Sequence, residues 1–186
     1  MYLNRVFSYQ SRKLLRPIEF IVQMIILGVD PGTATMGYGV LEKTGNRYHA
    51  LAYGVIETPK TQPAHERLLT LYRGLSALVE RYQPDALATE QLLFSTNRRT
   101  AIQVARAAGI ALLVAAEAGV EWREYTPLQV KQAVTGYGGA DKKQVQTMVQ
   151  RLLGLESVPK PDDAADALAV AICHAHHATM LTLTKP

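Results

Sequence analysis

Cysteine and long hydrophobic runs are both scarce in this chain of 186 residues, and each scarcity excludes a class of protein. Cys173 is the single cysteine, so an internal disulfide framework is excluded and a reducing, cytoplasmic location is expected. No CxxC or paired Cys/His spacing indicates a zinc site. No uninterrupted apolar run approaches the ~20 residues that cross a bilayer. The sequence therefore predicts an ordinary globular protein with a hydrophobic core.

Charge is also sparse, because charged residues make up 19% of the chain and the net charge is +4. Residues 1–23 hold four basic residues and one acid, which leaves the remaining chain with only +1. The local distribution is more informative. Residues 91–106 carry three arginines and no acid, and residues 131–151 carry four basic residues against Asp141 alone. A nearly neutral body with basic segments beside an acidic site is typical of a nuclease.

Residues 1–23 lack the apolar core and small-residue cleavage site of a secretory signal, so a signal peptide is rejected. We predict that they form a disordered extension or reflect a mis-assigned start, because Met24 directly precedes the first apolar strand. A basic arm that contacts DNA is the alternative. The predicted organisation is a single domain over residues 24–178, followed by a tail at 179–186.

The order of apolar segments predicts an α/β fold. Three segments joined by short turns come first, and later strands alternate with helices, which predicts a five-stranded mixed sheet whose first three strands are antiparallel. The later strands are expected to be parallel, with helices covering the sheet. No internal repeat or low-complexity segment is present. The predicted strands are 25–30, 37–41, 48–56, 86–89 and 120–125, and the predicted helices are 64–81, 95–119, 128–134, 141–153 and 161–177.

Carboxylates stand where two of these strands end. Asp30 closes the run from Ile25 to Val29, and Glu90 closes the run from Ala86 to Thr89. Taken alone, Asp30 is better explained as the start of the Pro-Gly turn that follows it. Glu90 favours a functional role, because glutamate has poor strand propensity and yet directly follows an apolar strand.

Three further acids open the last helix. Asp162 and Asp163 follow Pro161, and either could simply cap the helix. Asp166 lies a turn deeper in an apolar helix and must be buried between layers, where a carboxylate needs a partner. Helical spacing lets Asp166 share a face with Asp162 or with Asp163. Clustered acids without a basic neighbour indicate Mg²⁺ or Mn²⁺, and hence metal-assisted phosphodiester hydrolysis.

Four segments carry a resemblance to a known family. Residues 26–33 with 37–40, residues 88–91, the basic residues 129–132 with 140–146, and residues 163–169 resemble, in this order, motifs of the RuvC family of Holliday-junction resolvases. The match extends from about Met24 to His177. It implies a ribonuclease-H-like fold and four catalytic acids that are also the metal ligands, and it favours Asp163 over Asp162. The implied set is Asp30, Glu90, Asp163 and Asp166.

The resemblance also implies an activity. It predicts a homodimeric, structure-selective endonuclease that resolves four-way junctions by paired, symmetric nicks in DNA recombination and repair. The nicks would leave 5′-phosphate ends. Two Mg²⁺ ions are expected in each active site, with Mn²⁺ as a possible substitute and Asp30 as the bridge between the ions. A RuvA/RuvB branch-migration complex is the further partner that the family implies.

Basic and aromatic residues near these motifs are candidates for DNA binding. Phe94 is either a wedge that stacks on an unpaired base or a core or interface aromatic. The polar residues after it either meet phosphate at a helix start or are solvated, and each lysine is either a phosphate contact or an ordinary surface charge. The candidates are Phe94, Asn97, Arg98, Arg99, Lys131, Lys142 and Lys143.

The helix predicted near residues 97–119 is rich in alanine, which favours close packing on the sheet or contact with a second helix across a twofold axis. His174, His176 and His177 lie in the predicted last turn of the final helix at a spacing that is not that of a zinc site, so a metal role is rejected. Cys173 is expected to be a small buried hydrophobe.

Two other functions were weighed against a nuclease. A sugar-kinase or actin-like ATPase resembles this chain at residues 28–33, but that class needs a second glycine-rich phosphate loop and usually a duplicated domain, and neither is present. A junction-binding protein without catalysis is the other alternative. Four intact acids argue against it, because a pure DNA binder would gain from losing charges that repel phosphate.

Overall fold

A five-stranded sheet forms the centre of the structure, a computed structural model that describes residues 23–91 and 98–183, with side chains over 23–91 and 101–178. The strand order is β3-β2-β1-β4-β5. The first three strands are antiparallel, whereas β4 is parallel to both β1 and β5. The predicted mixed sheet is therefore confirmed. The strands are β1 (Gln23–Asp30), β2 (Thr35–Thr44), β3 (Arg47–Glu57), β4 (Ala86–Glu90) and β5 (Glu121–Tyr125).

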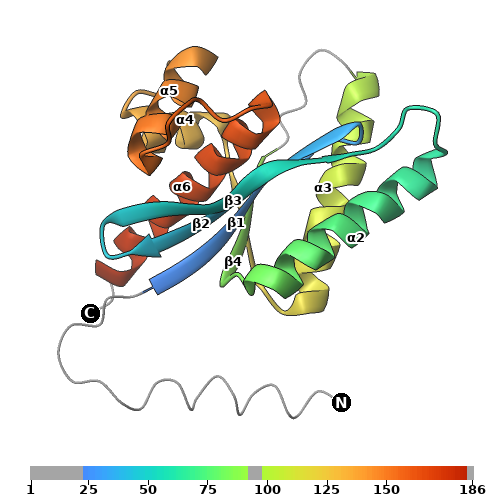
Figure 1. The fold of residues 1–186 in the computed structure, drawn as a ribbon, viewed down its shortest axis with the longest axis horizontal. Helices are drawn as coiled ribbons and strands as arrows, with labels where there is room; N and C mark the ends of the chain where they lie inside the picture. The colour runs from blue at the N-terminus through green and yellow to red at the C-terminus, as the bar shows by residue number, and fades with distance from the viewer. Residues whose placement is uncertain (1–22, 92–97, 184–186) are drawn as a thin grey trace, which may run out of the picture.

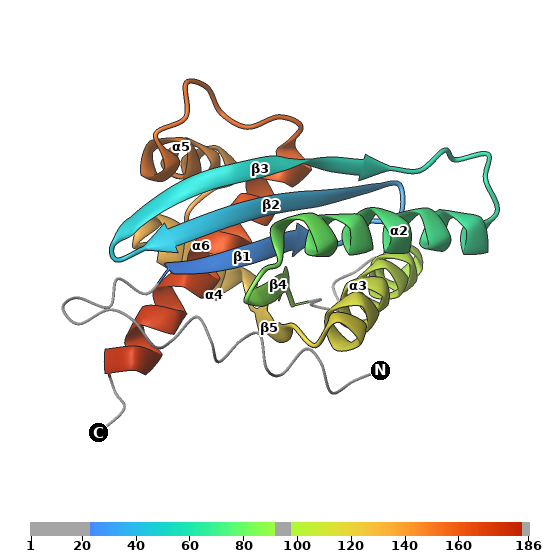
Figure 2. The ribbon, with the colours of Figure 1, turned by 60° about the horizontal axis from the view of Figure 1, so that its bottom comes forward.

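Helices cover both faces of the sheet, as Figures 1 and 2 show. One face carries α2 and α3, and the other carries α4, α5 and α6, so two separate hydrophobic clusters lie on either side of the strands. This layering lets β1, at the centre, be apolar on both of its faces. The helices are α2 (Ala64–Tyr82), α3 (Arg98–Ala118), α4 (Pro127–Thr135), α5 (Lys142–Leu153) and α6 (Asp162–Leu183).

Local sequence fixes both ends of α4 and α5. The side chains of Thr126 and Asp141 each accept a hydrogen bond from the backbone N–H three residues later. The side chain of the glutamine at that later position accepts a hydrogen bond from the backbone N–H of the capping residue, which completes a capping box at both helix starts. Gly136 and Gly154 end the two helices in the left-handed conformation that glycine adopts at little cost. The cap at Asp141 therefore fixes the position of Lys142, the first residue of α5.

The final helix differs from the prediction in length. The predicted end near His177 is wrong, because α6 continues to Leu183. Residues 178–183 contain neither glycine nor proline, so nothing in the backbone chemistry stops the helix there. In its first four turns α6 is enclosed between the sheet and the layer of α4 and α5 (Figure 1), and Ala164, Leu168 and Ile172 are fully buried.

Helix α3 is buried on one side only. Its inner face packs on the sheet through Ala107, Ala111 and Ala115, which are fully buried. Its outer face exposes Ile102 and Leu113. By length and composition the window Ala101–Ala118 could also cross a membrane, and only 22% of it is buried. Because α3 is the crossover between the parallel strands β4 and β5, it is an integral part of the domain with an apolar outer stripe.

Candidate active site

Three of the four predicted acids line one cavity. Asp30 ends β1 and Glu90 ends β4, and because these strands are parallel neighbours their carboxyl ends meet at one edge of the sheet. Asp163, in the first turn of α6, closes the cavity from the other layer. The cavity has a volume of about 360 Å³. Its lining residues are Asp30, Pro31, Gly32, Glu90, Gln91, Val104 and Asp163.

Two glycines bring α6 close enough to the sheet for this meeting. A Cβ atom at Gly37, in β2, would overlap the carbonyl oxygen of Asp163. A Cβ atom at Gly28, in β1, would overlap the carbonyl oxygen of Ala167 one turn later. Only residues without a side chain permit this approach of helix backbone to strand backbone. The glycines therefore set the depth at which the α6 acids enter the site.

Asp30 is the electrostatic centre of the cluster. Its pKa is raised from 3.8 to about 7, first by burial and then by the negative charges of Asp166, Asp163 and Glu90. The positive charge of Lys142 opposes this rise. A rise in pKa is the direction expected for a buried carboxylate among like charges.

Glu90 and Asp166 are shifted in the same direction. Burial raises the pKa of Glu90, the charge of Asp166 adds to the rise, and the charge of Lys131 in α4 opposes it. Burial also raises the pKa of Asp166, against the opposing hydrogen bond and charge of Lys142. The four predicted acids therefore interact electrostatically as one group, flanked by two lysines.

Lys142 is engaged with acids rather than free for phosphate. Its Nζ lies 3.1 Å from Oδ2 of Asp166 and 3.3 Å from Oδ2 of Asp162. Burial alone lowers the pKa of Lys142, but the hydrogen bonds and charges of Asp166 and Asp162 outweigh it, so the net pKa is raised. The DNA contact predicted for Lys142 stays a prediction. The pairing with acids was not foreseen, because sequence spacing does not show that α5 begins beside α6.

The donor set fits a hard divalent cation, although its oxygens do not converge on one point. Carboxylate oxygens are the ligands that Mg²⁺ and Mn²⁺ prefer, and the raised pKa of Asp30 marks negative charge in need of compensation. Within the described residues, no three His, Cys, Asp or Glu side chains are arranged to hold a single ion. The raised pKa of Asp30 and the lack of a converged ligand set are consistent, because Coulomb interactions extend well beyond the ligation distance of ~2.0–2.1 Å for Mg²⁺. Asp166 does not line the cavity and pairs with Lys142, yet its charge is the largest of those that raise the pKa of Asp30.

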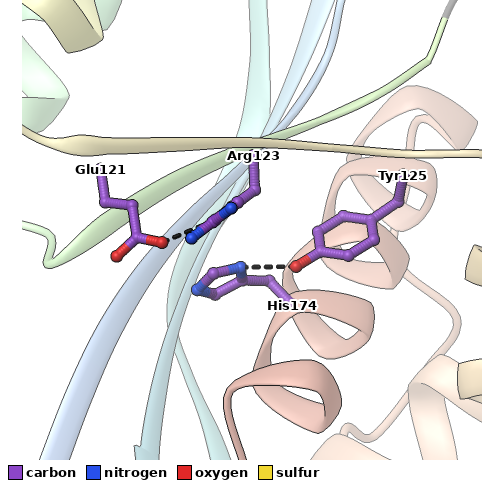
Figure 3. A network of polar contacts seen from close by, with 4 residues as sticks. All are labelled: Glu121, Arg123, Tyr125 and His174. Atoms are coloured by element: carbon purple, nitrogen blue, oxygen red, sulfur yellow. Dashed lines mark hydrogen bonds and ion pairs between the residues drawn. The ribbon is translucent and has the colours of Figure 1, made fainter. Parts of the chain in front are cut away.

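A polar network lies against the middle of α6, and Figure 3 shows its four side chains. The hydroxyl of Tyr125 lies 2.8 Å from Nδ1 of His174, and Arg123 pairs with Glu121 at 2.6 Å. Burial lowers the pKa of His174 to about 4, so the ring is neutral at pH 7. Tyr125 is the register partner of Glu90, and its carbonyl accepts a hydrogen bond from the backbone N–H of Gln91. The network therefore ties α6 to the strand ends that carry the cavity.

The remaining predicted residues are placed as follows. Phe94 and Asn97 lie outside the described residues, and Arg98 and Arg99 start α3, with their side chains outside the described part. Lys143 is exposed on α5. Cys173 is fully buried, as predicted.

Sequence reasoning left the role of Asp162 open and did not single out two residues of the cavity lining. Asp162 was considered only as a cap or as an alternative ligand, whereas it pairs with Lys142. Gln91 and Val104 line the cavity. The position of Gln91 directly after Glu90 was a signal that could have found it, but Val104 lies in a helix whose distance from the strand ends the sequence does not reveal.

Comparison with known proteins identifies the family. The sequence profile of the family described as "Crossover junction endodeoxyribonuclease RuvC" matches residues 26–174. This chain belongs to the RuvC family. Curated relatives carry the same description. The protein of Desulfitobacterium hafniense (strain DSM 10664 / DCB-2) is 56% identical over 158 residues, 85% of this chain and 96% of the relative. That of Desulforamulus reducens is 59% identical over 152 residues, 82% of this chain and 93% of the relative.

Solved structures support the same family and fold. The structure described as T. thermophilus RuvC in complex with Holliday junction substrate matches with a TM-score of 0.81 and 39% identity. The match covers 86% of this chain and 97% of that one. The yeast mitochondrial Holliday junction resolvase Ydc2 matches with a TM-score of 0.64 and 13% identity, over 97% of this chain and 88% of that one, which shows a shared fold alone. The predicted ribonuclease-H-like fold of the RuvC family is confirmed.

Proposed function

We propose that this protein is a metal-dependent endonuclease that resolves four-way Holliday junctions. The observation that carries the proposal is the carboxylate cluster at the carboxyl ends of β1 and β4, closed by α6, in a chain of the RuvC family. Carboxylates clustered in one place repel one another and do not stabilise the fold, which favours a role as a cation site. A relative of known structure is described with Holliday junction DNA, which supports the substrate.

The four acids would have different roles in metal binding because they occupy different positions. Asp30 interacts with Glu90, Asp163 and Asp166, so it is the residue best placed to be shared between two ions. Glu90 reaches the cavity from the end of β4 and Asp163 from the first turn of α6, and both would supply carboxylate ligands. Two bound Mg²⁺ ions would stabilise the attacking and leaving oxygens and lower the pKa of the attacking water. Lys131 and Lys142 flank the cluster and would orient the phosphate, and the products would be 5′-phosphate and 3′-hydroxyl ends.

The outer stripe of α3 supports a homodimer. Ile102 and Leu113 are 57% and 53% exposed, and a Cβ atom at Gly109, between them on the same helix face, would meet no atom within 4 Å. Exposed apolar residues in line on one helix are typical of an interface. A twofold dimer would offer one active site to each of two strands of a nearly symmetric junction, which accounts for paired nicks. Partnership with a RuvA/RuvB branch-migration complex stays a prediction that rests on the family resemblance, and a cytoplasmic location stays one that rests on the single cysteine.

The test is cleavage of a mobile four-way junction beside linear duplex of the same sequence, with Mg²⁺, Mn²⁺ or Ca²⁺. We expect symmetric nicks in the junction with Mg²⁺ and Mn²⁺, and nicked products that a DNA ligase reseals. Asp166→Asn should lower the cleavage rate at least about a hundredfold while junction binding is kept, because it removes a ligand but also a charge that repels DNA.

Glu156→Gln is the matched control, because it removes the charge of an exposed acid outside the cluster. It should cut at the wild-type rate. Equal cutting of junction and duplex would contradict the proposed selectivity. Tight junction binding without cutting by the wild-type protein would favour the catalytically silent binder, and stabilisation by a nucleotide would favour the ATPase class.

A further inference from the structure

Lys142 stands between two carboxylates of α6, and one of them belongs to the proposed metal site. The Nζ atom is 3.1 Å from Asp166 and 3.3 Å from Asp162. The capping box at Asp141 fixes the start of α5, so the position of Lys142 is set by backbone chemistry rather than by a mobile loop. Within the part of the chain that the structure describes, the pair with Asp166 is the only ion pair that involves an acid of the cluster.

The two partners of Lys142 differ in their surroundings. The side chain of Asp166 is 30% exposed, whereas that of Asp162 is 63% exposed. An ion pair that is partly withdrawn from water is stronger than one in solvent, so Asp166 is the tighter partner and Asp162 the looser one. Neither carboxylate lines the cavity, but Asp162 is exposed at the helix start, whereas Asp166 is half-buried one turn later.

A divalent ion that bound Oδ2 of Asp166 would compete with the ammonium group of Lys142, which contacts the same oxygen. A metal ligand donates its lone pairs at close range, and an oxygen that accepts a hydrogen bond from an ammonium group is a poorer donor to a second cation. The like charges around Asp30 require a counter-charge, and Lys142 supplies part of it. A metal that bound through this oxygen would therefore displace Lys142 from Asp166.

We propose that Lys142 is an internal counter-cation that competes with the divalent metal for Asp166, and that Asp162 retains it at the rim of the site once the metal has bound. Asp162 is then a positioning residue, since it holds the displaced ammonium group where a substrate phosphate can take it up. The exposed pair with Asp162 is weak enough to be released to a phosphate, which carries more charge. The inference rests on the proposed metal-dependent nuclease function.

The first test measures Mn²⁺ affinity calorimetrically on the DNA-free, full-length protein. Lys142→Met keeps the length of the side chain and removes its charge, so it should bind Mn²⁺ about tenfold more tightly than wild type. Lys143→Met is the matched control, because Lys143 is the next residue of α5, is exposed, and makes no ion pair within the described residues. It should change the affinity by less than about twofold. Equal affinities for the Lys142→Met and Lys143→Met proteins would overturn the proposal.

The second test separates displacement from simple repulsion between Lys142 and the metal. NMR signals of lysine ammonium groups persist in ion pairs and broaden when the group exchanges freely with water. On titration with Mg²⁺ the Lys142 signal should shift in the wild type and broaden in Asp162→Asn, where no second partner remains. A Lys142 signal that saturating Mg²⁺ leaves unchanged would contradict displacement. If none of the proteins binds Mn²⁺, the proposed metal-dependent function itself fails, and the inference with it.

Discussion

Asp30 shows how a single residue links stability to the proposed chemistry. Its pKa in the folded state is raised to about 7, whereas its ordinary value is 3.8. The folded protein therefore holds this proton more tightly than the unfolded chain does. The resulting stabilisation is fully present below about pH 4 and is lost as the pH rises to about 7. At higher pH the ionised, buried carboxylate is a net cost to folding unless a cation compensates it.

Asp30→Asn should consequently stabilise the metal-free protein at pH 8. The neutral amide avoids the burial of a charge, and we expect the free energy of unfolding to rise by about 1–3 kcal/mol. At pH 4 the two proteins should be nearly equally stable. Urea denaturation in EDTA across this pH range, at fixed protein concentration, measures the difference.

The matched control is Glu124→Gln, an exposed acid of β5. It should leave the free energy of unfolding within about 0.5 kcal/mol of wild type at both pH values. Added Mg²⁺ should raise the stability of the wild type but not that of Asp30→Asn. A variant that is less stable than wild type at pH 8 would show that Asp30 is compensated within the protein and needs no metal.

At the scale of elements, the site depends on how closely α6 approaches the sheet. Gly37 in β2 faces the backbone of Asp163, so any side chain there would have to push the helix start outward. The fully buried residues of α6, such as Leu168, leave little room for the helix to tilt. Position 37 therefore couples the packing of the fold to the geometry of the acids.

Gly37→Ala should cost about 1–3 kcal/mol of stability by overpacking and should weaken Mn²⁺ binding, because Asp163 moves away from Asp30. Thermal unfolding and calorimetry measure the two effects. Gly54→Ala, in β3, is the matched control, since the atoms nearest to its new Cβ belong to the end of the Tyr38 side chain, which can move. Wild-type Mn²⁺ affinity in Gly37→Ala would refute the role of this close approach.

At the scale of the whole molecule, the main feature is the exposed apolar face of α3. The β4–α3–β5 crossover places the helix on the sheet face that it shares with α2, opposite to α4, α5 and α6 (Figure 2). Its apolar stripe points away from the sheet, because the residues that pack on the core, Ala107 and Ala111 among them, lie on the opposite side of the helix. A second copy of the chain is the occupant that the proposed function requires.

Leu113→Glu should yield a monomer, since a charge would be buried in the apolar interface. Sedimentation velocity measures the oligomeric state, and circular dichroism should show unchanged helix content. Paired nicking should drop more than single nicking, because the two active sites would no longer act together. Leu51→Glu is the control, an exposed leucine of β3 that lies outside the stripe, and it should stay dimeric. A dimer that survives Leu113→Glu would exclude this face.

Much of the fold follows from patterns that act over a few residues. Apolar runs located the strands, and the capping residues Thr126 and Asp141 located two helix starts, since these signals depend on nearest neighbours along the chain. The predicted end of α6 near His177 is wrong, because the sequence from 178 to Leu183 holds no glycine or proline that would mark where the helix stops.

The sequence by itself determined the kind of chemistry, because acids at strand ends and in a buried helix can be recognised from hydrophobic pattern alone and their order matches one family. Only the tertiary structure decided which atoms meet. It separated Asp163, in the cavity, from Asp162, at the rim, and it paired Lys142 with Asp166. Those contacts join residues of different elements, and their distances depend on helix–sheet packing, which no local pattern specifies.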